Sequence, residues 1–116
     1  MEDFFREYSQ FIRAYRAITV IEDPLEKNVS VTYLPPIAVK ALIKDLIASQ
    51  ISWKIPGIST DKAVEIIIQK RDRSIIENSY KIEINGEIYE SWKSNGKMQI
   101  RTLGDYCRIY CYLKRE

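Results

Sequence analysis

The stretch from Tyr80 to Lys114 constrains the fold of this chain most strongly, because three two-residue turns divide it into four short segments. The turns are Asn85-Gly86, Asn95-Gly96 and Gly104-Asp105. Glycine and asparagine adopt the positive backbone φ angles of tight hairpins at little energetic cost. Residues 80–114 are therefore expected to form an antiparallel meander of four strands.

The register set by these turns separates the side chains of the meander into an apolar face and a charged face. Across the second turn it pairs Ser91 with Ile100 and Lys93 with Met98, and the last strand then places Cys111 opposite Met98. The predicted inner face holds Ile82, Ile84, Tyr89, Met98, Ile100, Cys107, Ile109 and Cys111. The opposite face carries Lys81, Glu90, Arg101 and Arg108. Because three separate turns agree on one apolar face, the meander is well supported.

The outer face of the meander also gathers aromatic residues. Trp92 and Tyr110 fall side by side there, with Arg101 and Arg108 close to them. A second layer of the same domain, or the curvature of a barrel, would cover the two rings. Alternatively, these four residues contact another subunit, since Trp, Tyr and Arg are enriched where interfaces concentrate their binding energy. They are candidate interface residues.

The beginning of the chain has the pattern of an amphipathic helix. Large apolar residues recur there at a spacing of three or four, at Phe4, Phe5, Tyr8, Phe11, Ile12 and Tyr15. We expect a single domain, with a helix over residues 1–17 and a β-rich body over residues 18–116. The aromatic side of the helix either packs on its own sheet or docks on a neighbouring subunit, which makes Phe4, Phe5 and Tyr8 candidate interface residues.

The middle of the chain is expected to be mostly strand. Short β-branched or alternating segments predict strands at residues 18–22, 29–34, 51–54 and 64–69, and a short helix is expected at 74–78. Residues 37–49 leave two alternatives open, because their periodicity favours a helix while their length also suits a barrel strand. The expected fold class is mainly β, a small barrel or sandwich with an N-terminal helix and one or two short helices.

Composition argues against catalysis and against tight binding of nucleic acid. The 116 residues include no histidine, the commonest general base and metal ligand, and only two cysteines. The four glycines show no nucleotide-binding spacing, and the net charge of +2 is spread over both halves. We expect no enzymatic activity, no cofactor and no metal. Cys107 and Cys111 lie too far apart along one predicted strand for a disulfide, and we expect them to be buried thiols.

Several motifs resemble those of a known family. They are the segments Val39–Ile43 and Trp53–Gly57, an I-x-I-x-G-x-x-Y hairpin at Ile82–Tyr89, and a D-Y-x-R-I closing strand at Asp105–Ile109. Together they are similar to the small head–tail connector proteins of long-tailed phages, in the version found in PBSX-like defective prophages of Gram-positive bacteria. The similarity extends over most of residues 29–114.

The resemblance implies a structural role in virion assembly without catalytic residues. Such proteins form a ring beneath the portal, help close the capsid after DNA packaging and provide the surface on which the tail docks. The expected partners are further copies of the chain, portal or adaptor proteins, and tail-completion proteins, with DNA passing nearby but not bound specifically. The chain is expected in the cytoplasm during assembly and then at the head–tail interface of the virion, without a membrane segment. The alternative is a β-barrel interaction module or a single-stranded nucleic-acid-binding protein.

Overall fold

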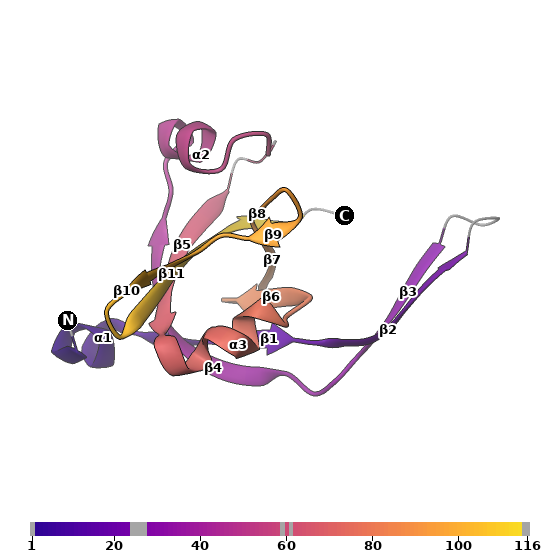
Figure 1. Cartoon of the computed structure of the whole chain (residues 1–116), viewed down its shortest axis with the longest axis horizontal. Coiled ribbons are helices and arrows are strands. Elements are labelled where there is room, and N and C mark those ends of the chain that lie inside the picture. Colours follow the sequence, from indigo (N-terminus) through magenta and orange to yellow (C-terminus); the bar gives the residue numbers. More distant parts are fainter. Residues whose placement is uncertain (1, 24–27, 59, 61, 115–116) are drawn as a thin grey trace.

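The chain folds mainly into β-structure, as a closed antiparallel barrel with short helices around it (Figure 1). This computed structural model describes residues 2–23, 28–58, 60 and 62–114. Within these residues, one sheet has the strand order β10-β11-β5-β4-β1-β6-β7, and β7 also pairs with β11. Six strands therefore close into a barrel, and β10 extends the sheet beside β11.

Short helices and two small hairpins are interspersed among the barrel strands along the chain. The barrel sheet contains β1 (Gln10–Tyr15), β4 (Ile37–Asp45), β5 (Ala63–Gln69), β6 (Lys81–Ile84), β7 (Glu87–Ser91), β10 (Ile100–Leu103) and β11 (Tyr106–Leu113). Two separate hairpins are formed by β2 (Ala17–Asp23) with β3 (Asn28–Tyr33) and by β8 (Lys93–Ser94) with β9 (Lys97–Met98). The helices are α1 (Glu2–Tyr8), α2 (Ala48–Lys54) and α3 (Arg73–Glu77), with a 3-10 turn η1 (Lys70–Asp72) before α3.

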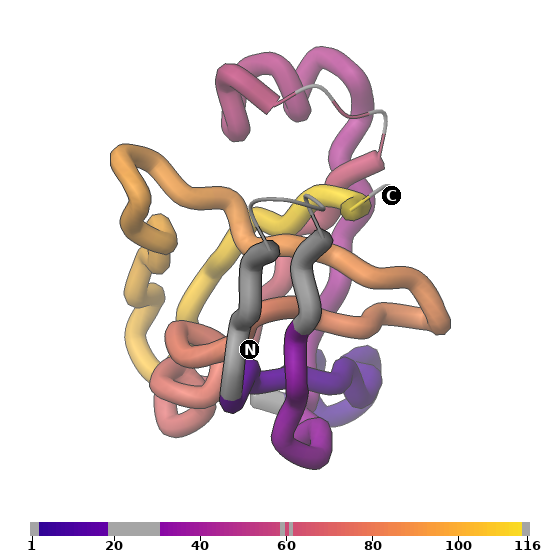
Figure 2. The backbone as a smooth tube through the Cα atoms, turned by 90° about the vertical axis from the view of Figure 1, so that its right-hand side faces the viewer, coloured from indigo at the N-terminus to yellow at the C-terminus, as the bar shows by residue number. Residues whose placement is uncertain are grey.

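The main core fills the barrel with branched aliphatic side chains, which suit the pleated strands that supply them. It consists of Ile12, Ala14, Val39, Ala41, Val64, Ile66, Ile68, Ile76, Ile82, Ile84, Tyr89, Cys107, Ile109 and Cys111. Ile76 comes from α3, so this helix packs against the barrel interior. Figure 2 shows α2 at the opposite end of the barrel from α3. A second, smaller cluster of buried side chains lies beneath α2.

The β2–β3 hairpin stands apart from the barrel. Its two strands pair with each other along residues 17–23 and 28–33, and neither joins the barrel sheet. In Figure 1 the hairpin runs away from the barrel on the side opposite α1 and β10. This arm contributes to the elongated shape of the molecule, which measures 52 Å along its longest axis.

The three turns of the meander are confirmed, and two pairings between its strands are corrected. Asn85 and Asn95 have positive φ angles of 51° and 56°, as their hairpins require. The pairings of Ile82 with Tyr89 and of Lys93 with Met98 occur as predicted. Ser91, however, faces Cys111 rather than Ile100, and Cys111 therefore does not lie opposite Met98 as predicted. The reason is barrel closure, since β7 pairs directly with β11 and leaves β8–β9 as a separate hairpin.

The helix expected over residues 1–17 is too long. Only residues 2–8 are helical, and residues 10–15 form β1, which lies between β4 and β6 in the barrel. In β1 the buried side chains Ile12 and Ala14 alternate with the exposed Phe11 and Arg13. Pairing on both edges of β1 therefore prevails over the helical spacing of its apolar residues.

The segment from 37 to 54 corrects two further expectations. Residues 37–45 form a strand, so the helix favoured by periodicity is wrong and the alternative of a barrel strand is right. Residues 48–54, predicted partly as extended, are the helix α2. Ile51 and Ile55 are four residues apart and both buried, which places them on one side of this helix. The strands at 17–23, 28–33 and 63–69 and the helix at 73–77 match their predictions within two residues.

Candidate interaction surfaces

A small pocket lies on the outer side of β10 and β11, and it brings together four of the candidate interface residues. We call it the aromatic–arginine pocket; its volume is about 120 Å³, and Trp92, Gln99, Ile100, Arg101, Arg108 and Tyr110 line it. The backbone N–H of Trp92 donates a hydrogen bond of 2.8 Å to the carbonyl of Tyr110, which fixes the two residues side by side. Their place on one surface follows from the pairing of β7 with β11, which ends at Ser91 and Cys111, and Arg101 and Arg108 join them through the pairing of β10 with β11.

Helix α2 covers part of this surface. Trp92, Tyr110 and Tyr112 pack against a buried cluster formed by Leu46, Ile51, Ile55 and Ala63. Both Trp92 and Tyr110 nevertheless stay only half-buried. A second layer of the domain therefore covers one side of the rings, and their other side borders the pocket. The contact with another subunit remains a prediction.

The charges of the pocket are unbalanced. Arg101 and Arg108 face each other directly in the β10–β11 register. The Nε atom of Arg108 lies 3.5 Å from an Oε atom of Glu65, whose side chain is nearly buried. Arg101 is exposed, and among the described residues it has no ion-pair partner. The pocket thus carries one positive charge that the described protein does not neutralise.

A larger apolar groove lies next to it, between α1 and the outer side of β4 and β5. We call it the α1 groove; its volume is about 370 Å³, and Phe4, Tyr8, Leu42, Ile43, Lys44, Glu65 and Ile67 line it. The rings of Phe4 and Tyr8 are 4.7 Å apart between centroids, and they are 55% and 61% exposed. Because Glu65 lines the α1 groove and also pairs with Arg108, the two hollows are neighbours on one side of the barrel.

Phe5 is the one candidate interface residue that does not lie on this surface. Its side chain is 3% exposed, and its ring centroid is 5.2 Å from that of Tyr106 on β11. Phe5 therefore anchors α1 to the barrel of its own chain. For this residue the expectation of packing on the chain's own sheet is the correct one, whereas Phe4 and Tyr8 keep their rings in solvent.

Sequence reasoning missed the most exposed aromatic residue. Trp53 is 80% exposed on α2 and lines a separate shallow hollow with Ser49, Gln50 and Lys54. The short apolar–polar alternation of residues 51–54 favoured a strand, so the exposed position of Trp53 on a helix was not predicted. Helical spacing of Ile51 and Ile55 would have placed Trp53 on the opposite, solvent-facing side.

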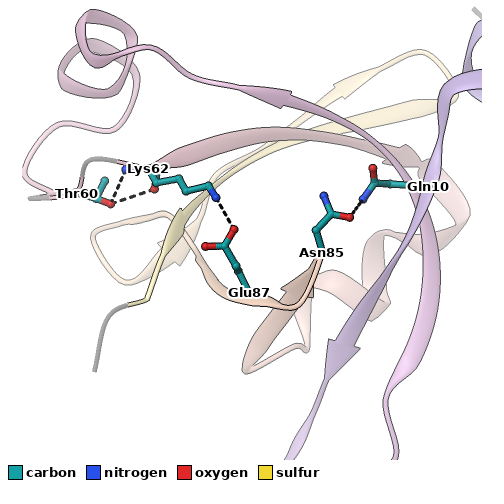
Figure 3. A network of polar contacts seen from close by, with 5 residues as sticks. All are labelled: Gln10, Thr60, Lys62, Asn85 and Glu87. Carbon is teal, nitrogen blue, oxygen red and sulfur yellow. Dashed lines mark hydrogen bonds and ion pairs between the residues drawn. The ribbon is translucent and has the colours of Figure 1, made fainter.

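Polar contacts around the β6–β7 turn serve the fold (Figure 3). The Nε2 group of Gln10 donates a hydrogen bond of 2.8 Å to the side-chain oxygen of Asn85, which joins β1 to the turn. Lys62, just before β5, forms an ion pair with Glu87 at the start of β7, and this contact raises the pKa of the lysine. The first contact joins β1 to the β6–β7 turn, and the second spans β11, which lies between β5 and β7.

The described residues contain few groups suited to catalysis. They include no cluster of three or more His, Cys, Asp or Glu side chains able to hold a metal ion. Both cysteines are free and buried, and burial raises the pKa of the Cys111 thiol to about 12. Burial therefore favours the uncharged form of this thiol. No helix in the part of the chain that the structure describes is long and apolar enough to span a membrane.

Comparisons with known proteins found no matching family model, no similar curated protein and no similar solved structure. Function is therefore inferred from the fold, the two neighbouring hollows and the sequence motifs.

Proposed function

We propose that this chain is a structural protein of phage assembly, a head–tail connector subunit that forms a ring beneath the portal. In this role it helps close the capsid after DNA packaging and offers the surface on which the tail docks. The observation that carries the proposal is the combination of exposed contact elements on a closed barrel. An arm leaves the barrel on one side, and two neighbouring hollows lie on the barrel wall, one with exposed and one with half-buried aromatic rings.

A ring of identical subunits needs two different surfaces that fit each other, because its interface is heterologous. The β2–β3 arm and the side that carries α1 lie at opposite sides of the molecule in Figure 1. A barrel that supports such elements can repeat head to tail around an axis. The sequence motifs shared with small connector proteins favour a ring beneath a portal over other repeating assemblies.

The charge of the chain suits this position. DNA passes through the centre of a connector, and a strongly basic surface would hold its phosphates. The net charge of +2 for 116 residues is far from that of a strongly basic protein. A near-neutral subunit lets the duplex pass without gripping it.

The double substitution Phe4→Ser/Tyr8→Ser tests the proposal. Both rings are exposed, so we expect the variant to stay folded and monomeric. Loss of two aromatic contacts of about 1–2 kcal/mol each should weaken ring assembly by about 30-fold or more. Trp53→Ser is the matched control, since Trp53 is more exposed but lines neither hollow. Light scattering with the portal and adaptor proteins encoded beside the chain measures assembly.

Equal assembly of the double variant and the control would contradict this use of the α1 groove. Deletion of residues 1–17 is a poorer test, because it removes β1 from the barrel and unfolds the protein. The point substitutions leave every barrel strand in place.

A second candidate function is binding of single-stranded nucleic acid. The observation that favours it is the aromatic–arginine pocket, since small barrels bind single strands by stacking bases on aromatic rings beside arginines. Anisotropy of a fluorescent oligo-dT tests it. Binding that weakens steeply with salt, and that is lost in Trp92→Ala, would favour this function.

A further inference from the structure

We propose that the free edge of β10, together with the aromatic–arginine pocket, binds an extended acidic peptide segment of a partner protein. The segment adds as a further strand beside β10, and one of its carboxylates lies between Arg101 and Arg108. The inference rests on the proposed function in taking this side of the barrel as a contact surface, and it names the chemistry of the partner.

The first observation is an unpaired strand edge. β10 pairs with β11 and with no other described strand, so it ends the sheet. Leu103 and Tyr106 flank the two-residue turn, and pairs in an antiparallel ladder alternate between hydrogen-bonded and non-hydrogen-bonded. The N–H and C=O of Thr102 therefore point away from β11. Such an edge is a template for another strand, which is how several peptide-binding domains capture extended ligands.

The second observation is the pair of facing arginines. Like charges directly opposite on neighbouring strands repel each other. Glu65 approaches Arg108 from β5, but nothing described approaches Arg101 in the same way. The Nε–H of Arg108 is buried and makes no hydrogen bond to the described residues. A carboxylate between the two guanidinium groups would supply the missing negative charge.

The pocket is suited to one acidic side chain and not to a nucleic-acid strand. Its volume of about 120 Å³ is small, and the half-buried rings of Trp92 and Tyr110 form an apolar wall for the methylene groups of a Glu side chain. A strand of nucleic acid needs a basic track along several phosphates. Two cations, Arg101 and Arg108, line this pocket, and the Nζ of Lys54 lies over the Tyr110 ring, 5.5 Å from its centroid.

The same geometry predicts a sequence preference. Arg101 and Leu103 are two residues apart on β10 and therefore point to the same side, and both are exposed. A strand added at the edge presents every second side chain to that side. An acidic residue opposite Arg101 would pair with its charge, and an apolar residue two positions away would pack against Leu103.

The experiment uses the Trp53→Phe chain, in which Trp92 is the only tryptophan. Its fluorescence is titrated with an acetylated, amidated peptide, Thr-Val-Thr-Glu-Thr-Val-Thr, and with the same peptide carrying Gln in place of Glu. We expect the Glu peptide to bind at least about 10-fold more tightly, with the difference shrinking in Arg101→Gln. Thr102→Pro should abolish binding of both peptides, because it removes an edge donor, while the control Thr102→Val retains it.

Equal affinity for the two peptides, or no saturable binding at millimolar concentration, would overturn the inference. Tighter binding of oligo-dT at the same site, displaced by neither peptide, would overturn it in favour of nucleic acid. Peptide binding by a chain that never forms rings would contradict the proposed function alone. Ring assembly by a chain indifferent to both peptides would contradict the inference alone.

Discussion

Replacement of Phe5 by alanine should destabilise the protein through loss of the anchor of α1. Phe5 is 3% exposed and packs against Tyr106. Truncation of a buried phenylalanine costs about 3–5 kcal/mol in protein cores. Because α1 is a short helix on the outside of the barrel and can detach from it, the loss cannot exceed its docking free energy. We therefore expect the lower end of that range, about 3 kcal/mol.

This free energy converts into a large change in melting temperature. An unfolding entropy of about 2.1 cal/mol/K per residue gives about 240 cal/mol/K for the 116 residues. A loss of about 3 kcal/mol then lowers Tm by about 12 °C. Thermal unfolding followed by circular dichroism or calorimetry measures the shift.

The neighbouring residue provides a matched control. Phe4 is 55% exposed, so Phe4→Ala removes little buried surface and should lower Tm by only about 2–4 °C, at ~4 °C per kcal/mol. Equal shifts for the two variants would refute the reasoning. They would show that α1 contributes to stability by its helical structure alone and that Phe5 is not its anchor.

Three further predictions concern the interior and the turns. Since burial raises the pKa of Cys111 from 9.0 to about 12, the unfolded thiol loses its proton first as pH rises. The free energy of unfolding should fall by up to about 1.4 kcal/mol per pH unit across that window, and Cys111→Ala should remove this part of the slope in urea titrations. Gly86→Ala should cost about 1 kcal/mol by denaturant unfolding, because φ is +81° there while no atom would touch the added Cβ; a neutral substitution would contradict the strain. Glu65→Gln should cost about 1–2 kcal/mol, because the partly buried Arg108 loses its partner, whereas a gain in stability would show that desolvation of the pair outweighs its attraction.

Local turn chemistry made the C-terminal part of the fold predictable. The Asn-Gly turns fix their hairpins within a few residues, so the inner face of residues 80–114 could be derived from spacing alone. The pairing of β7 with β11 could not, because barrel closure depends on contacts between residues far apart in sequence. Residues 10–15 show the same limit, since Phe11, Ile12 and Tyr15 fit a helix as well as the strand that tertiary pairing selects.

The candidate surface was predictable in part for the same reason. The Gly104-Asp105 turn sets the β10–β11 register, so the position of Arg101 beside Arg108 could be predicted. Trp92 joins them beside Tyr110 through the pairing of β7 with β11, which the sequence did not reveal. The ion pair of Arg108 with Glu65 joins strands whose pairing the sequence did not reveal. Phe4 and Phe5 are adjacent in sequence, and only the packing of α1 shows which of the two is buried.

The most direct test of the connector function is the mass of the purified chain in solution with its assembly partners. Light scattering should give about the monomer mass of 13.6 kDa for the chain alone. Addition of the portal and adaptor proteins encoded beside it should produce a complex that contains many copies of the chain, visible as a ring by electron microscopy. A chain that stays monomeric beside fully assembled portal and adaptor rings would contradict the proposal.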